Sequence, residues 1–321
     1  MKVYGKENIV DIVSSMINKN RLAHSFLLYG EKGTGKKFMA DYISKMIMCR
    51  NSENGIPCGK CHVCRNIDKG IYSDVIRAEH SGKLGGFSVE TVKDICADTN
   101  VFPNEGERKV YIFSDCDAIS AFAQNKLLKT IEEPPEFVYF IFTAPSKEIF
   151  LDTIISRVVS MAVHEVSKKE CFEALEEHGF SHDECQEAID MLGGNIGKCI
   201  SYMKDEKFRK TVELTKKLAD CIINRDEYQF LTVISSPEID RTAFKDIIYI
   251  LDNIIRDSAV IRFDKELSSG CYSQGAAELS ERLSLSRAEN IHSQLMKSLE
   301  YLDSNVNLKV ITASLCRSIL S

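Results

Sequence analysis

The glycine-rich segment GEKGTGKK, residues 30–37, constrains the fold of this chain more than any other feature. It follows the apolar run SFLLY and precedes a run with helical spacing, which is the strand–loop–helix context of a phosphate-binding loop. Gly30, Gly33 and Gly35 allow backbone N–H groups to turn toward a phosphate, and Lys36 is placed to reach the outer phosphates. The segment therefore predicts an α/β fold with nucleotide-binding ancestry.

The last position of this motif departs from the usual pattern. A Ser or Thr hydroxyl normally ligates Mg²⁺ there, but this chain has Lys37, whose ammonium cannot ligate a cation. The second metal-holding segment is an apolar strand that ends in acidic residues. In the usual alignment Ser114 takes the Asp position and Asp115 the Glu position, although a shift by one residue restores an Asp at 115. The sequence therefore predicts a degenerate Mg²⁺ site without ATP hydrolysis, and it leaves ATP or ADP binding open.

The first part of the chain, residues 1–166, alternates strand-like and helix-like runs. This alternation favours a parallel sheet with crossover helices on its faces. Short buried strands are expected at 25–30, 74–79, 109–115, 137–144 and 158–166.

The remainder of the chain has only helical patterns. Residues 167–207 predict a small helical domain in which Ser167 and Ser181 begin two helices and Gly193 ends the second. Residues 208–321 predict a C-terminal helical domain, because their apolar residues recur at helical spacing. Two such stripes are Phe244, Ile247, Ile248, Leu251, Ile254 and Ile255, and Ile291, Leu295, Leu299 and Leu302.

Four of the twelve cysteines fall within one short segment, about 49–64, with the spacing C-x8-C-x2-C-x2-C. Four thiolates suit tetrahedral Zn²⁺ and leave no position for water, so a structural zinc module is expected. The alternatives are a redox pair and chance clustering. His62 lies inside a C-x2-C turn and is expected to point away from the site. The four expected ligands are Cys49, Cys58, Cys61 and Cys64.

The composition bears on whether the chain binds nucleic acid. The net charge is −6 and the pI is near 5.8, so the overall charge does not favour nucleic-acid binding, although a local basic patch stays open.

The longest apolar runs, such as 137–144, fall well short of the roughly 20 residues that span a bilayer. The N-terminus lacks a signal-peptide core, so a cytoplasmic location without a membrane is expected. Disulfides are rare there, and the eight scattered cysteines are expected to be small buried side chains.

Several segments together carry a family resemblance. The chain resembles the delta-prime family of bacterial DNA polymerase III clamp-loader subunits, which are AAA+ relatives of the gamma/tau subunits. The motifs extend from residue 1 to about 166, with a weaker similarity near 305. They are NRLAHSFLLYGEKGTGKK (20–37), the cysteine spacing, AQNKLLKTIEEPPEFVYFIFTA (123–144), IISR (154–157) and SNVNLKVI (304–311).

The resemblance implies a three-part subunit. Residues 1–166 would form the AAA+ core with its zinc module, 167–207 a helical lid, and 208–321 a collar that oligomerises with sister subunits. The implied role is in DNA replication, within a ring of gamma/tau, delta and delta-prime subunits that places the sliding clamp on primed DNA. The subunit would have no ATPase activity of its own and would act within the DNA polymerase III holoenzyme, a DNA-directed DNA polymerase. Partners would be gamma/tau and delta directly, and the clamp and primer-template DNA through the complex.

The resemblance also implies a role for Arg157, in the IISR segment. It would act in trans as an arginine finger at the ATP held by a neighbouring gamma/tau subunit, with Ser156 and Thr153 orienting its loop. The alternative is a surface arginine paired with a carboxylate. Glu132 and Glu133 are expected only to end a helix before two prolines. Two other functions stay open for the whole chain, an active gamma-type ATPase and a pure scaffold.

Overall fold

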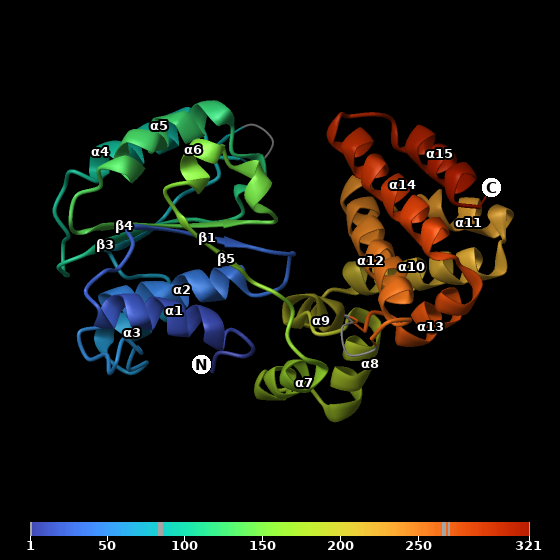
Figure 1. Cartoon of the computed structure of the whole chain (residues 1–321), viewed down its shortest axis with the longest axis horizontal. Helices are drawn as coiled ribbons and strands as arrows, with labels where there is room; N and C mark the ends of the chain where they lie inside the picture. Colours follow the sequence, from blue (N-terminus) through green and yellow to red (C-terminus); the bar gives the residue numbers. More distant parts are fainter. Residues whose placement is uncertain (1, 83–85, 265–267, 269, 321) are drawn as a thin grey trace. The chain divides into compact units, whose positions relative to one another are not determined.

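The computed structural model describes residues 2–82, 86–264, 268 and 270–320. The chain divides into two compact units, Met1–His164 and Glu165–Ser321 (Figure 1). The first unit contains a sheet with helices, whereas every regular element described in the second unit is a helix.

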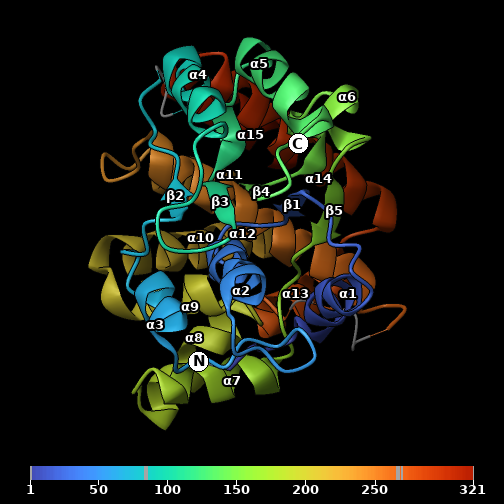
Figure 2. The same cartoon turned by 90° about the vertical axis from the view of Figure 1, so that its left-hand side faces the viewer.

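The first unit is built on one parallel five-stranded sheet. Its strand order is β2-β3-β4-β1-β5, and all neighbouring strands pair in parallel. Figure 2 shows the strands in this order across the sheet. The five predicted strands and the α/β class are thereby confirmed. The strands are β1 (Ser25–Tyr29), β2 (Val75–Arg77), β3 (Lys109–Phe113), β4 (Val138–Ala144) and β5 (Val159–Ala162).

Helices cover both faces of this sheet (Figure 1). Alternate side chains of a strand point to opposite faces, so each face has its own hydrophobic core. Phe26 and Leu28 of β1 pack with α1 and α2, and Leu27 packs with α4 and α5. One face carries α1 (Glu7–Asn18), α2 (Lys36–Met48) and α3 (His62–Asp68), and the other carries α4 (Val89–Asp98), α5 (Ala121–Glu132) and α6 (Asp152–Ile155). Two short 3₁₀ turns, η2 (Cys116–Ala118) and η3 (Lys147–Ile149), complete the unit.

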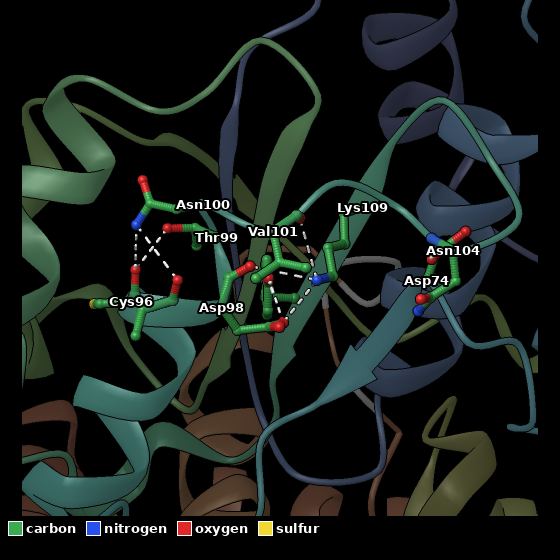
Figure 3. Close-up of polar contacts among 10 residues, drawn as sticks. Asp74, Cys96, Asp98, Thr99, Asn100, Val101, Asn104 and Lys109 are labelled. Atoms are coloured by element: carbon green, nitrogen blue, oxygen red, sulfur yellow. Dashed lines mark hydrogen bonds and ion pairs between the residues drawn. The ribbon is translucent and has the colours of Figure 1, made fainter.

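A buried polar network anchors the amino-terminal ends of β2 and β3 (Figure 3). The buried Lys109 ammonium lies 2.8 Å from Asp98 Oδ2, and the Tyr111 hydroxyl donates to the same oxygen at 2.7 Å. The buried Asp74 carboxylate accepts backbone N–H groups of Asn104, Glu105 and Gly106 at 2.6–2.8 Å. These contacts fix the loop that leads into β3, because each buried charge there has its partners.

In the second unit, the helices from α7 to α15 share one hydrophobic core. The predicted caps at Ser167 and Ser181 are both capping boxes, closed by Glu170 and Glu184. The division of this unit into a lid and a collar stays a prediction. The helices are α7 (Lys168–Glu177), α8 (His182–Leu192), α9 (Ile196–Lys204), α10 (Glu206–Asn224), α11 (Glu227–Ile234), α12 (Arg241–Val260), α13 (Ser273–Arg282), α14 (Leu285–Asp303) and α15 (Leu308–Leu320).

Within the described residues, no helix combines the length and the apolar character needed to cross a lipid bilayer.

Candidate functional site

The glycine-rich loop connects β1 to the first residue of α2, as the motif requires. Gly33 and Gly35 have φ angles of +89° and +92°, which glycine adopts without a steric penalty. The Lys36 ammonium folds back into the loop, where it donates to the carbonyl oxygens of Gly30 at 2.6 Å and Glu31 at 2.7 Å. The structure therefore brings the predicted loop residues together around Lys36, whose ammonium is bonded to backbone carbonyl oxygens of the loop.

Lys36 is buried and lies near several charges. Its pKa is lowered, mainly by burial, while the carboxylates of Asp115, Asp117 and Glu31 oppose that shift. The adjacent Lys37 lowers it further. A phosphate group at this loop would add negative charge and thereby favour the charged form of Lys36.

Lys37 forms an ion pair with Asp115, and the distance from Nζ to Oδ2 is 2.5 Å. Asp115 follows β3 with a φ angle of +52°, and its backbone N–H donates to the Thr143 hydroxyl at 2.8 Å. Asp115 therefore lies at the loop, and both alignments that the sequence allowed are compatible with this position. A carboxylate beside the loop therefore faces an ammonium, and this ammonium would repel a cation bound at the same place.

Arg157 lies just after α6, and three contacts hold its guanidinium. Nη1 donates to the Thr153 carbonyl at 2.8 Å and to the Ser156 hydroxyl at 3.0 Å. Nη2 lies 2.8 Å from Glu132 Oε1, at the last residue of α5. The Arg157 side chain is 39% exposed, so the guanidinium is oriented and still reachable from solvent. Sequence reasoning missed this role of Glu132, although its neighbouring glutamate and prolines had marked the helix end.

The four clustered cysteines converge on one point. Their sulfur atoms all lie within 4.8 Å of one another, with Cys49 Sγ 3.6 Å from Cys58 Sγ and 3.9 Å from Cys61 Sγ. Tetrahedral Zn²⁺ with Zn–S bonds of about 2.3 Å separates its sulfurs by roughly 3.8 Å. The set, which includes Cys64, therefore fits zinc, and it is the only such group of potential metal ligands among the residues that the structure describes.

The local environment shifts the pKa values of the clustered thiols in different directions. Backbone N–H groups of Lys60 and Cys61 lower the pKa of Cys58 to about 6. Burial raises the pKa of both Cys49 and Cys64. His62, as expected, stays outside the cluster, since its Nε2 lies 2.8 Å from the Asn66 side-chain nitrogen.

The other eight cysteines were expected to be small buried side chains, and seven of them are buried. Cys96 is half-buried, and the remaining seven are buried. These seven are Cys116, Cys171, Cys185, Cys199, Cys221, Cys271 and Cys316.

Comparison with known families agrees with these features. The family described as "DNA polymerase III, delta subunit" matches residues 5–167, which is half of the chain. The chain belongs to this family. The resemblance inferred from the motifs is thus confirmed at the level of a clamp-loader AAA+ family member.

Individual relatives match about half of the chain. The DNA polymerase III gamma subunit of Buchnera aphidicola is 31% identical over 173 residues, which cover 54% of this chain and 47% of the relative. The tau subunit of Bacillus subtilis is 34% identical over 155 residues, 48% of this chain and 27% of the relative. The chain therefore spans less than half the length of either relative. Among solved structures, a gamma-subunit-related protein of Thermotoga maritima has a TM-score of 0.46 and 19% identity, covering 96% of this chain and 97% of that one.

Proposed function

We propose that this family member is a delta-prime-type subunit of the DNA polymerase III clamp loader. It would help to load the sliding clamp onto primed DNA while hydrolysing no ATP itself. The observation that carries this proposal is the ion pair between Lys37 and Asp115. An ammonium in the metal-ligand position leaves no Mg²⁺ to offset charge on a transferred phosphoryl group, so hydrolysis in this loop loses a main source of stabilisation.

Arg157 would supply the chemistry that this subunit contributes. A guanidinium inserted beside the ATP of a neighbouring gamma/tau subunit offsets negative charge that builds on the γ-phosphoryl group, and such fingers raise rates by about 10³–10⁵. Its contacts with Thr153 and Ser156 support the proposal, because they orient the planar group before it meets a ligand. Its partial exposure leaves it accessible to a neighbour.

The cysteine cluster would hold one structural zinc ion. The four sulfurs fill a tetrahedral coordination shell, so no position is left for a reacting water. The ion would tie the end of α2, which carries Cys49 as its C-cap, to the start of α3, where Cys61 is the N-cap.

The all-helical second unit would assemble with gamma/tau and delta subunits in the cytoplasm. The clamp and the primer-template DNA would then be reached through the assembled complex. The acidic net charge of the chain supports this indirect route, because it does not favour DNA binding by the isolated subunit.

Two alternative functions have specific support. The curated relatives with which the chain aligns are named gamma or tau subunits, which favours an active gamma-type ATPase. The Lys37–Asp115 pair argues against it. A pure scaffold is favoured by the ion pair between Arg157 and Glu132, since a structural arginine would have the same partner.

The deciding experiment measures DNA-stimulated ATPase and clamp loading in a complex reconstituted with wild-type chain, Arg157→Ala or Arg157→Lys. Both variants should assemble normally by gel filtration, and both should lose activity at the site that Arg157 serves, since lysine cannot reproduce the planar fork. Undiminished activity of an assembled Arg157→Ala complex would support the scaffold. Mg²⁺-dependent turnover by the isolated chain that is abolished by Lys36→Ala would support the gamma-type ATPase.

A further inference from the structure

The Lys37–Asp115 pair occupies a place where this fold normally brings a hydroxyl and a carboxylate to one metal ion. The ammonium and the carboxylate are 2.5 Å apart, and their side chains are 63% and 47% exposed. An ion pair this exposed is held by at most about 1 kcal/mol. Lys37 therefore stays available to an anion that enters the loop.

The neighbouring Lys36 is also held within the loop. The Lys36 ammonium is bonded to two carbonyl oxygens of the loop itself, those of Gly30 and Glu31. Both lysines lie in the first turn of α2, where the helix dipole also favours negative charge. The loop thus combines two adjacent ammonium groups with a backbone built for phosphate.

We propose that the Lys37 ammonium takes the electrostatic place of magnesium, so that the loop binds the polyphosphate of a nucleoside di- or triphosphate in its metal-free form. Lys36 exchanges its two carbonyl partners for phosphate oxygens, and Lys37 contacts the same polyphosphate while Asp115 keeps its backbone bond to Thr143. The inference rests on the proposed function, because both take the loop to be a phosphate-binding loop without a Mg²⁺ site.

Magnesium should then weaken binding. A metal-bound nucleotide has less negative charge to offer to the two lysines, and its cation is repelled by Lys37 at close range. Asp115 lies beside that ammonium, so a cation bound by its carboxylate would also lie close to a like charge.

The test is titration calorimetry of the full chain with ADP and with ATP, with and without excess MgCl₂. The metal-free buffer is prepared without chelator, because a chelator would also remove zinc from the cysteine cluster. Wild type should bind at least as tightly without magnesium as with it. Lys37→Thr restores the hydroxyl and releases Asp115, so magnesium should tighten its nucleotide binding by about tenfold.

Two controls accompany this comparison. Lys37→Arg keeps the positive charge and should, like wild type, bind no more tightly with magnesium than without it, whereas Lys36→Ala should lose binding in both buffers. Bound Mn²⁺, followed by its paramagnetic resonance in the presence of nucleotide, should appear in Lys37→Thr and be absent from wild type.

Three results would overturn the inference. Wild-type binding that requires magnesium contradicts it and leaves the role of Arg157 untouched, as does the absence of nucleotide binding in both buffers. Mg²⁺-dependent hydrolysis by wild type overturns both this inference and the proposed function.

Discussion

Arg157 and Glu132 form an ion pair on the surface of the AAA+ unit, with Nη2 2.8 Å from Oε1. The last residue of α5 thereby contacts the residue that we propose as an arginine finger. Both side chains are partly exposed, at 39% and 43%. The carboxylate orients the guanidinium without removing it from solvent.

Glu132→Gln should change the activity of a reconstituted loader only modestly. An ion pair between half-exposed groups contributes about 0–1 kcal/mol, which corresponds to at most about fivefold in rate. The bonds from Arg157 to Thr153 and Ser156 remain in this variant. The measurement is DNA-stimulated ATPase beside Arg157→Ala in the same preparation. A loss from Glu132→Gln as large as that from Arg157→Ala would show that Glu132 itself is required.

Purified chain should contain about one zinc ion, measured by elemental mass spectrometry. Cys61→Ser should lose that zinc and lower the melting temperature, because the ion links α2 to α3. Cys96→Ser is the matched control, since Cys96 is half-buried and lies outside the cluster. Full zinc content in Cys61→Ser would contradict a four-sulfur site.

Gly30→Ala should destabilise the AAA+ unit more than Gly35→Ala. A Cβ atom at Gly30 would lie 2.2 Å from the Val163 carbonyl oxygen, so backbone would have to move. A Cβ at Gly35 meets nothing within 4 Å, and only its φ of +92° is unfavourable, which costs about 1 kcal/mol. Urea unfolding of the two variants checks the order. Equal losses would show that the close approach of the Val163 carbonyl to Gly30 does not matter.

Asp98→Asn should reduce stability at neutral pH by about 1–2 kcal/mol, because the buried Lys109 ammonium loses its carboxylate. Burial acts to raise the pKa of Asp98, but hydrogen bonds from Lys109 and Tyr111 outweigh it and the pKa is lowered. The folded pKa thus lies below the unfolded value of about 3.9, so the contribution is present above that pH and disappears as pH falls through the folded pKa.

Urea unfolding between neutral and acidic pH measures this effect. The stability of Asp98→Asn should converge on that of wild type in acid. Asp94→Asn, at an exposed position of the same helix, is the control. A difference between wild type and Asp98→Asn that is constant across this pH range would contradict the ion pair as its source.

The local sequence determined much of the secondary structure and the position of the cysteine cluster. The two capping boxes depend on residues three positions apart, and the strands depend on short apolar runs, so both were predictable before folding was considered. The cysteine spacing likewise indicated a four-sulfur site, because tight turns bring neighbouring thiols to one ion.

Tertiary structure decided which charged side chains form ion pairs. The ion pair between Asp115 and Lys37 depended on the turn after β3, where Asp115 has a positive φ and a backbone bond to Thr143. The pairing of Arg157 with Glu132 depended on the packing of α6 beside α5. Periodicity and spacing describe neighbours along the chain, whereas an ion pair depends on distances across space that only the folded backbone establishes.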